Sequence, residues 1–281
     1  MKVLVTGAGG QVGRELVTAF ADHDVIACDH AALDVTARDA VLAAVTTVQP
    51  DAIVHAAAWT AVDACEADPA RANAVNGLAT RHVAEAAARV GAHLCYFSTD
   101  YVFDGSKPEP YVEWDEPNPK SAYGRSKLAG EREATLCPDT TIMRISWVCG
   151  QHGNNMVKTI LRLAGEHETL RFVDDQRGHP TFADDAAAMA RRLVVDRRPG
   201  LFHVTNQGDV SWFEFAQAVV ESSGADPARV LPIATADLDP PRPAPRPANS
   251  VLDNAALRGS GLPPLPHYRE SLDRLVATLS A

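Results

Sequence analysis

The sequence predicts an α/β protein in which helices cover both faces of a doubly wound parallel sheet. Short apolar runs alternate with helical patterns through the first half of the chain, and a glycine-rich turn joins the first run to the first helix. Composition agrees with this fold class. With 46% hydrophobic and 22% charged residues, a chain of 281 residues can bury a large core without metals or disulfides.

Five apolar runs are the predicted strands of this sheet. They cover residues 2–6, 25–29, 52–57, 92–97 and 141–145. Between them, an amphipathic pattern over 11–22 and an alanine-rich segment over 71–90 predict helices. Because strands alternate with helices, neighbouring strands are expected to run parallel.

A glycine-rich turn, TGAGGQVG, follows the first strand and opens the first helix. Gly7 permits a tight turn, Gly10 lets the backbone approach a pyrophosphate, and Gly13 lets helix and strand pack closely. The helix N-terminus then offers free N–H groups to phosphate. This context predicts a Rossmann-type dinucleotide site rather than an ordinary βα turn.

An acidic residue, Asp29, ends the second predicted strand, where a carboxylate can bind the adenosine ribose. An acid there favours NADH, since it repels a 2′-phosphate, but the neighbouring His30 weakens that preference. The coenzyme is therefore either NADPH or NADH. Asp34, with Val35 beside it, is a second candidate contact near the adenine, and an N-cap or turn role for Asp34 is an equal alternative.

The second half predicts a smaller, discontinuous α/β substrate domain. Helices are expected over 155–167, 182–196 and 211–222, and short strands over 170–173 and 201–205. Residues 1–150 would form the dinucleotide-binding domain, to which a segment near 182–207 returns. The ranges 151–181 and 208–281 would bind substrate. Residues 239–247 hold five prolines in nine positions, which predicts a stiff, ordered loop over the substrate region rather than a linker.

A candidate catalytic group combines Thr99, at the end of the fourth strand, with Tyr123 and Lys127 on a predicted helix. The i, i+4 spacing puts the phenol and the ammonium on one helical face. Reduction of a ketone needs a hydride and a proton, and a neighbouring cation is expected to lower the pKa of the tyrosine. Lys127 can also hold the nicotinamide ribose, and Thr99 can donate to the carbonyl oxygen.

Matching segments run nearly from end to end and resemble the extended short-chain dehydrogenase/reductases, and within them the dTDP-4-dehydrorhamnose reductases. These segments are VTGAGGQVG (5–13), HAAAWTAVDACE (55–66), STDYVFDG (98–105), YVEWDEPNPKSAYGRSKLAGE (111–131), RISWVCG (144–150), VDDQRGHPT (173–181) and RPANSVLD (246–253). The resemblance implies NAD(P)H-dependent reduction at C4 of dTDP-4-dehydro-L-rhamnose in dTDP-rhamnose biosynthesis.

The resemblance also implies site residues. Tyr123 would donate the proton, Lys127 would assist it, and Thr99 would polarise the carbonyl. Thr99, Asp100, Tyr101 and Trp147 would bind the sugar, although core packing is an alternative for Trp147. The residues flanking the cofactor would be Gly10, Gln11, Val12, Ala56, Ala57, Ala58, Trp59 and Thr60.

Several alternatives stay open. Another dTDP-4-keto-deoxysugar is a possible substrate, and a non-catalytic cofactor-binding subunit like the methionine adenosyltransferase β-subunit is a second possibility. A sugar-nucleotide epimerase is a third. Tyr101 stands where 4,6-dehydratases of similar sequence carry glutamate, which favours simple reduction.

Metal binding is not expected, although some relatives bridge a dimer with magnesium. Glu15 matches one such ligand and Asp184 or Asp185 approximates another, but the C-terminal helix lacks the expected glutamate. The protein is expected to be a monomer or a homodimer.

Charge and cysteine usage limit the partners. A formal charge of −10 without a basic block argues against nucleic acid. Five scattered cysteines without a CxxC pair suit a reducing compartment. Met1 leads straight into a strand, and no apolar stretch is long enough for a membrane span, so a cytoplasmic enzyme acting on a nucleotide sugar is expected.

Overall fold

The predicted strands form one parallel sheet in the protein, whose computed structural model describes residues 1–280. The strands are β1 (Lys2–Thr6), β2 (Asp24–Cys28), β3 (Ala52–His55), β4 (His93–Thr99), β5 (Thr140–Ile145) and β10 (Gly200–His203). Their order across the sheet is β10-β5-β4-β3-β1-β2, with every pair parallel. The direction of winding reverses between β1 and β3, which is where such sheets bind ligands.

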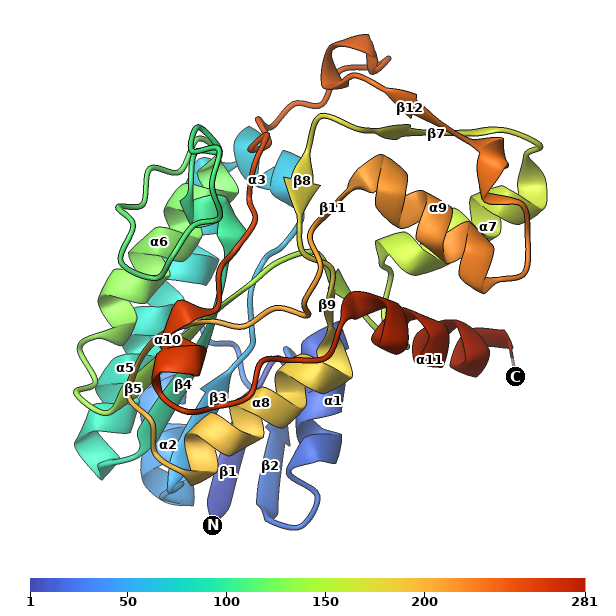
Figure 1. Ribbon diagram of the computed structural model, residues 1–281. Helices are drawn as coiled ribbons and strands as arrows, with labels where there is room; N and C mark the ends of the chain where they lie inside the picture. Colours follow the sequence, from blue (N-terminus) through green and yellow to red (C-terminus); the bar gives the residue numbers. More distant parts are fainter. Residues whose placement is uncertain (281) are drawn as a thin grey trace.

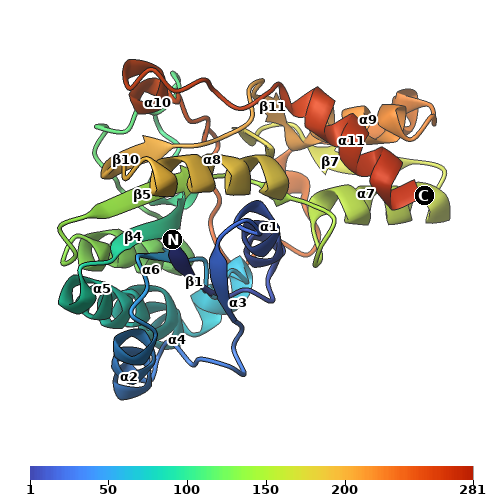
Figure 2. The ribbon, with the colours of Figure 1, turned by 90° about the horizontal axis from the view of Figure 1, so that it is seen from below.

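Helices cover both faces of this sheet, as Figure 2 shows. The helices are α1 (Gln11–Ala19), α2 (Arg38–Val48), α5 (Ala79–Val90), α6 (Ala122–Ala134) and α8 (Ala183–Val195). On one face, Leu16 of α1 and Leu193 of α8 share a buried core with Val5, and on the other face Val41 of α2 shares a core with Leu4. Because successive strand residues point to opposite faces and both faces are buried, the strands are apolar throughout. The predicted fold class is confirmed.

A smaller lobe lies beyond the C-terminal ends of the strands (Figure 1). Its helices are α7 (Met156–Glu166), α9 (Trp212–Ser222) and α11 (Tyr268–Ser280). Its strands are short and paired two by two: β7 (Leu170–Val173) with β12 (Val230–Ile233), β8 (Arg177–Gly178) with β11 (Val210–Ser211), and β6 (Val148–Cys149) with β9 (Thr181–Phe182). Ile160, Phe215 and Tyr268 belong to its separate core.

The chain crosses between the two parts more than once. After the first elements of the lobe, α8 and β10 return to the sheet, and α10 (Ala255–Gly259) packs beside β10 before α11 closes the lobe. The division into domains at residue 150 stays a prediction about independent units. Within the described part of the chain, no helix has both the length and the apolar character that a bilayer span requires.

The predicted helix over 71–90 is interrupted. The chain forms α3 (Val62–Ala67), α4 (Pro69–Asn73), a five-residue π-helical turn (Ala74–Leu78) and then α5. Gly77 lies in that turn, where an added Cβ would come within 3.2 Å of the Ala129 side chain on α6. The wide turn therefore accommodates close packing against α6, which the apolar pattern alone does not reveal.

The proline-rich segment 239–247 contains no strand and no α-helix, in agreement with its composition. It is held by an ion pair in which Arg246 donates from both guanidinium nitrogens to Asp63 of α3, each at 2.8 Å. Ala244 is buried next to this pair. The segment is thus held against α3, which follows β3 in the chain.

Candidate active site

A cavity of about 410 Å³ opens at the carboxyl ends of the strands and contains most of the predicted site. It is lined by Gly10, Gln11, Val12, Ala56, Ala58, Thr60, Thr99, Asp100, Tyr101, Tyr123, Lys127, Trp147 and Trp212, among others. An adjoining cavity of about 330 Å³ shares Gly10, Ala56 and Ala58 and adds Gly7, Asp34, Val35 and Ala57. The two cavities form an elongated site from the glycine-rich turn to the predicted catalytic residues.

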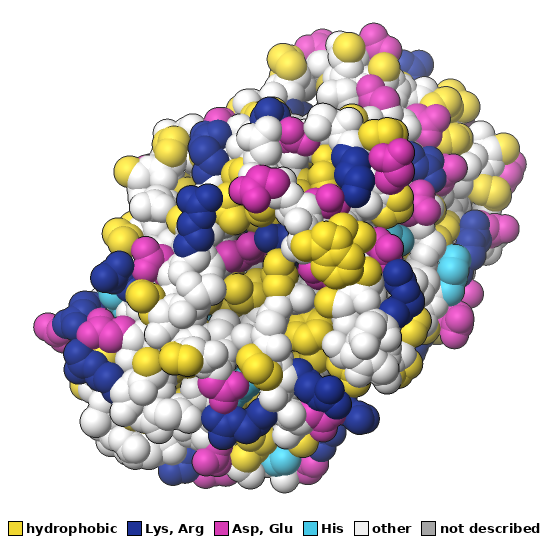
Figure 3. All heavy atoms as spheres, turned by 60° about the vertical axis from the view of Figure 1, so that its left-hand side comes forward, with side chains coloured by type: hydrophobic (Ala, Val, Ile, Leu, Met, Phe, Trp, Pro, Cys, Tyr) yellow, Lys and Arg dark blue, Asp and Glu magenta, His cyan; other side chains and the backbone are white. Residues whose placement is uncertain are grey.

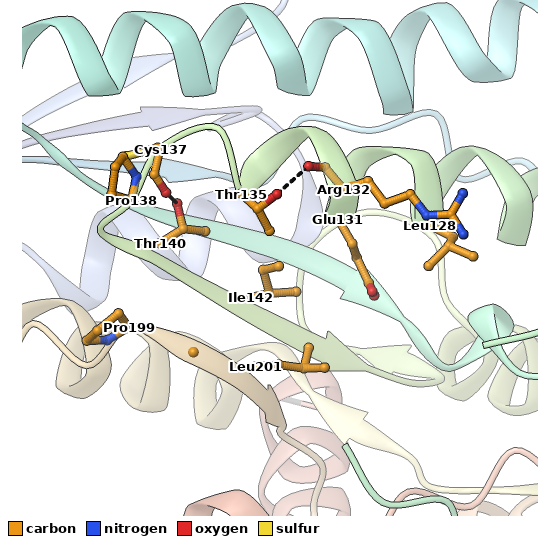
Figure 4. A pocket seen from close by; sticks show the side chains of 11 residues that line it. Leu128, Glu131, Arg132, Thr135, Cys137, Pro138, Thr140, Ile142, Pro199 and Leu201 are labelled. Atoms are coloured by element: carbon orange, nitrogen blue, oxygen red, sulfur yellow. Dashed lines mark hydrogen bonds between the residues drawn. The ribbon is translucent and has the colours of Figure 1, made fainter. Parts of the chain in front are cut away.

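A larger cavity of about 540 Å³ lies elsewhere, between the far end of α6 and the strands β5 and β10 (Figure 4). Its walls include Leu128, Glu131, Ile142 and Leu201. None of the predicted site residues lines it, and its lining is mostly apolar. Size alone therefore does not identify the reactive site here.

The glycine-rich turn has the geometry of a phosphate cradle. Gly7 has φ +69°, and an added Cβ there would lie 2.7 Å from the backbone of Ala57. A Cβ on Gly13 would lie 2.0 Å from the Gly7 carbonyl oxygen. No side chain caps the N-terminus of α1 at Gly10, so its N–H groups are free to bind a pyrophosphate. These residues fit a dinucleotide.

The two predicted acidic contacts lie on one side of this turn. Asp29 directly follows β2 and is exposed. Its Cβ is 3.4 Å from the position of a Cβ on Gly9, and its carboxylate accepts a hydrogen bond from the N–H of Ala32 at 2.8 Å. Asp34 lines the smaller cavity and accepts hydrogen bonds from the N–H and hydroxyl of Thr36, which lower its pKa. Both carboxylates thus belong to tight turns as well as to the site.

Local packing places the catalytic pair. Ser121 caps α6 by accepting a hydrogen bond from Gly124 N–H at 3.1 Å. A Cβ on Gly124 would approach the Tyr101 carbonyl oxygen to 2.2 Å, so only glycine lets α6 pack this closely against the loop after β4. Tyr123 and Lys127 are consequently buried beside Thr99, and Lys127 Nζ donates to the Phe97 carbonyl at 2.6 Å.

The electrostatics differ from the sequence expectation in one respect. Burial raises the pKa of Tyr123 above its usual value, and hydrogen bonding with Thr99 opposes the shift. The expected lowering of the Tyr123 pKa by Lys127 is therefore not observed, and burial lowers the pKa of Lys127 itself to about 7. A raised pKa keeps the phenol protonated, which is the state that a proton donor needs.

Asp100 is the other unusual group. It is 1% exposed, its Oδ1 accepts from the Thr99 hydroxyl at 3.0 Å, and burial raises its pKa to about 6. Its Oδ2 is buried without a hydrogen-bond partner although Asp100 lines the cavity. Because buried carboxylate oxygens are normally satisfied, a hydroxyl of a bound ligand would complete this site.

Two aromatic pairs line the cavity of about 410 Å³. Trp147, at φ +42°, stacks on Trp212 of α9 with ring centroids 3.6 Å apart. Gly178 makes room for this indole, since a Cβ there would lie 2.7 Å from it. Tyr101 meets Tyr123 edge to face at 5.6 Å. Trp212 was not predicted, because its distant segment reaches the site only through the folding of the smaller lobe.

Asn76 is a second residue that the sequence did not reveal. It lies in the π-helical turn, where its amide accepts from Trp59 N–H at 2.8 Å and donates to the Trp59 carbonyl at 3.0 Å and to Ser126 Oγ at 2.9 Å. It therefore joins the cofactor loop to the catalytic helix. The Trp59 ring itself packs under Arg71, with 4.4 Å from the guanidinium carbon to the ring centroid.

Three of the predicted cofactor residues do not line either cavity. They are Gly13, Asp29 and Trp59. Gly13 acts through packing, Asp29 lies at the rim, and Trp59 contributes its backbone to the loop. The remaining predicted residues are brought together.

The acidic residues considered for magnesium lie beside basic side chains. Arg274 of α11 donates to Asp184 Oδ2 and to Asp185 Oδ1, each at 2.8 Å. His152 lies 3.6 Å from Glu15. A guanidinium already neutralises the two aspartates, and no group of three metal-ligating side chains occurs within residues 1–280. No step of the chemistry below uses a metal.

Surface charge is mixed on the face shown in Figure 3, where basic side chains lie among acidic ones and form no continuous basic surface. That pattern gives no support to a nucleic-acid partner.

Comparison with known proteins identifies relatives over the whole chain. A family model described as "RmlD substrate binding domain" matches residues 1–281. A dTDP-4-dehydrorhamnose reductase of Streptomyces griseus is 44% identical, over 96% of this chain and 91% of the relative. A probable dTDP-4,6-dihydroxy-2-methyloxan-3-one 4-ketoreductase of Streptomyces antibioticus is 42% identical, over 97% and 93%. The crystal structure of a Bacillus anthracis dTDP-4-dehydrorhamnose reductase in complex with NADP superposes with a TM-score of 0.95, at 38% identity and 99% coverage of both chains.

Proposed function

The chain belongs to the dTDP-4-dehydrorhamnose reductase family of extended short-chain dehydrogenase/reductases, and we propose that it reduces the 4-keto group of dTDP-4-dehydro-L-rhamnose to give dTDP-L-rhamnose. The observation that carries this proposal is the single elongated site, in which Thr99, Tyr123 and Lys127 lie next to a dinucleotide cradle. A binding subunit would have no chemical use for this arrangement.

Each residue has a distinct role in the proposed reaction. A nicotinamide coenzyme, when bound in the cradle, would supply the hydride for C4 of the sugar. Thr99 orients the keto group through its hydroxyl, and Tyr123 transfers its phenolic proton to the developing alkoxide. Lys127 would hold the nicotinamide ribose and stabilise the phenolate that remains. A preformed acid of this kind contributes ~10²–10⁴ in rate.

The sugar would occupy the wall formed by Asp100, Tyr101 and Trp147. A sugar hydroxyl that donates to the unpartnered Asp100 Oδ2 would orient the ring and satisfy that buried oxygen. Trp147 and Trp212 would offer a flat apolar surface to one face of the sugar. Ligand pockets are commonly lined by aromatic side chains with a few polar groups that orient the ligand, and this wall has both.

Either NADPH or NADH fits the cradle. Asp29 at its rim disfavours a 2′-phosphate, whereas Arg14, whose Nε donates to the Gly9 carbonyl at 3.2 Å, provides a cation at the same turn. The Bacillus anthracis relative binds NADP. We propose that the chain accepts both coenzymes.

A second candidate substrate is another dTDP-4-keto-deoxysugar, because the ketoreductase of Streptomyces antibioticus is nearly as similar as the dTDP-4-dehydrorhamnose reductase of Streptomyces griseus. The catalytic residues would serve both substrates, and only the sugar-binding wall would discriminate.

The test supplies enzymatically generated dTDP-4-dehydro-L-rhamnose and follows NADPH and NADH oxidation, with product identified by chromatography and mass spectrometry. Tyr123→Phe is expected to lower kcat by ~10²–10⁴ while coenzyme binding stays unchanged. Wild-type protein that binds coenzyme but forms no dTDP-L-rhamnose would contradict the proposed substrate. Full activity of Tyr123→Phe would contradict the proton-donor role.

A further inference from the structure

Three chemically active side chains lie at intervals of four residues along α6. They are Tyr123, Lys127 and Glu131, and all three are buried. Side chains four apart on a helix lie on the same face, one above the other. A phenol, an ammonium and a carboxylate thus form a row, and only the first two enter the proposed chemistry.

Glu131 is held by strong hydrogen bonds. Its Oε1 accepts from Ser98 Oγ at 2.5 Å and from Arg144 Nε at 2.8 Å, and its Oε2 accepts from Arg144 Nη2 at 2.7 Å. Ser98 immediately follows Phe97, whose carbonyl accepts from Lys127 Nζ. Lys127 and Glu131 therefore form hydrogen bonds with consecutive residues of β4, Phe97 and Ser98, and both attach α6 to the sheet.

Glu131 makes no direct hydrogen bond with Lys127, but among the charges around the lysine it is the one that favours the protonated form. From β3, His55 lies buried with a pKa lowered to about 3, so it is neutral at working pH. From β4, the Tyr96 ring lies 4.2 Å from Nζ, and Tyr123 comes from α6 itself. From β5, Arg144 directs its guanidinium to Glu131. Burial lowers the pKa of Lys127 to about 7, and Glu131 opposes that shift.

We propose that Glu131 is a positioning residue that acts through Lys127: from the next turn of α6 its carboxylate favours the protonated form of the lysine, without touching the reacting groups. The inference rests on the proposed function for its kinetic consequence, but not for its effect on Lys127. Figure 4 shows Glu131 extending from α6 towards the strands in the wall of the larger cavity, one turn beyond Leu128. It touches neither the nucleotide cradle nor the sugar wall.

The sign of the effect follows from the charges. Loss of the carboxylate favours the neutral form of Lys127, so its pKa falls further. At slightly alkaline pH less of the lysine is then charged, and stabilisation of the Tyr123 phenolate is lost earlier as pH rises. The alkaline limb of kcat against pH is expected to move to lower pH.

The direct test uses the whole protein labelled with ¹³Cε-lysine. The chain has five lysines, so Lys127→Met identifies the Lys127 signal by its disappearance. The titration midpoint of that signal is expected to fall by ~1 pH unit in Glu131→Gln, the usual size of one nearby charge. An unchanged midpoint in the folded variant would overturn the proposal, whatever substrate the enzyme uses.

The kinetic test compares Glu131→Gln with Glu133→Gln. Glu133 lies on the same helix but pairs at the surface with Arg81 at 3.2 Å. Glu131→Gln is expected to lower kcat at pH 8 about tenfold, to shift the alkaline limb downward and to leave substrate KM unchanged. Glu133→Gln should leave all three unchanged. A uniform loss of kcat without a shifted limb would indicate a merely structural role.

Glu131→Gln leaves Arg144 buried without its partner, which can prevent folding. The double variant Glu131→Gln/Arg144→Met removes both charges and keeps the volume. Because loss of the Arg144 cation favours the protonated form of Lys127 again, the Lys127 midpoint is expected to fall by less than in Glu131→Gln but to stay below that of the wild type. A midpoint at or above the wild-type value in the folded double variant would overturn the proposal.

Discussion

The sheet and the smaller lobe are built by different means. In the sheet, each of the first four strands is joined to the next by one covering segment, and the cores on its two faces come from alternate residues of the same strands. In the lobe, the strands are two to four residues long and pair across distant parts of the sequence. Isolated bridges, such as Tyr111 with Leu252 and Gln207 with His267, connect its segments to the rest.

This difference suggests that the two parts contribute separately to one site, the sheet to coenzyme binding and catalysis and the lobe to substrate binding. The sheet and the loops after its strands position the phosphate cradle and the predicted catalytic residues. The lobe supplies Trp212, which stacks on Trp147 in the proposed sugar-binding wall. We expect residues of the lobe to discriminate between keto sugars, since one fold can carry sites of different specificity. Changes in the sheet should therefore act on coenzyme and catalysis, and changes in the lobe on substrate.

The largest contrast is expected from one chemical change made in both parts. Gly13→Ala places a methyl group 2.0 Å from the Gly7 carbonyl oxygen, so the cradle must distort. We expect coenzyme affinity to fall at least tenfold and the free energy of unfolding to fall by ~1–3 kcal/mol. Coenzyme titration by fluorescence and denaturant unfolding measure these effects.

The matched control for that change is Gly165→Ala in α7, where an added Cβ meets nothing within 4 Å. Alanine in a helix should raise the free energy of unfolding by ~0.5–1 kcal/mol and leave coenzyme affinity unchanged. Equal destabilisation by both variants would erase the distinction between the two parts.

Removal of one indole tests the wall. Trp212→Ala deletes the ring stacked on Trp147, and substrate KM should rise about tenfold, equivalent to ~1.4 kcal/mol of lost binding. The coenzyme dissociation constant should not change. Steady-state kinetics with varied sugar nucleotide measure the first quantity. Trp114→Ala, at a ring that is 73% exposed, is the control. A parallel loss of coenzyme affinity would show that the two tasks are not separate.

The rim of the cradle should set coenzyme preference. Asp29→Ala removes a carboxylate near the expected 2′-phosphate, and the ratio of kcat/KM for NADPH to that for NADH should rise about fivefold, the effect of ~1 kcal/mol between solvent-exposed charges. Asp24→Ala, at the opposite end of β2, should not alter the ratio. An unchanged ratio in Asp29→Ala would show that residues other than Asp29 determine the preference between NADPH and NADH.

The smallest effect concerns α11. Arg274 already neutralises Asp184 and Asp185, so chelation of Mg²⁺ should leave the Tm of the wild type unchanged. Arg274→Glu adds a third carboxylate, which should lower Tm in chelator. Mg²⁺ should then restore ~1 kcal/mol, or about 2–4 °C. Differential scanning calorimetry compares the two proteins. A wild-type Tm that falls in chelator would contradict the view that Arg274 takes the place of a cation between Asp184 and Asp185.

The predictable part of the site is the part encoded over short distances. Gly7 to Gly13, and Tyr123 with Lys127, depend on spacing within one turn and one helix, so the sequence shows them. Asn76 was missed because its role depends on a π-helical turn packed against α6. Trp212 and Glu131 were missed because their partners, Trp147 and Arg144, come from other elements.

The pKa of Tyr123 was mispredicted for a related reason. Charge proximity can be read from spacing, but burial depends on the whole fold, and burial dominates at both Tyr123 and Lys127. The helix boundaries that differ, such as the end of α1 at Ala19, follow from packing at the helix ends rather than from periodicity.

The position of β10 has a consequence for synthesis on the ribosome. Residues 200–203 emerge long after β5, so the nascent sheet presents an open edge while α7, the short strands β6 to β9 and α8 are being translated. During that interval His203 does not yet cover Arg144. An unpaired parallel edge invites association with other chains. Nascent chains truncated near residue 150 should therefore depend on chaperones more than the complete protein does.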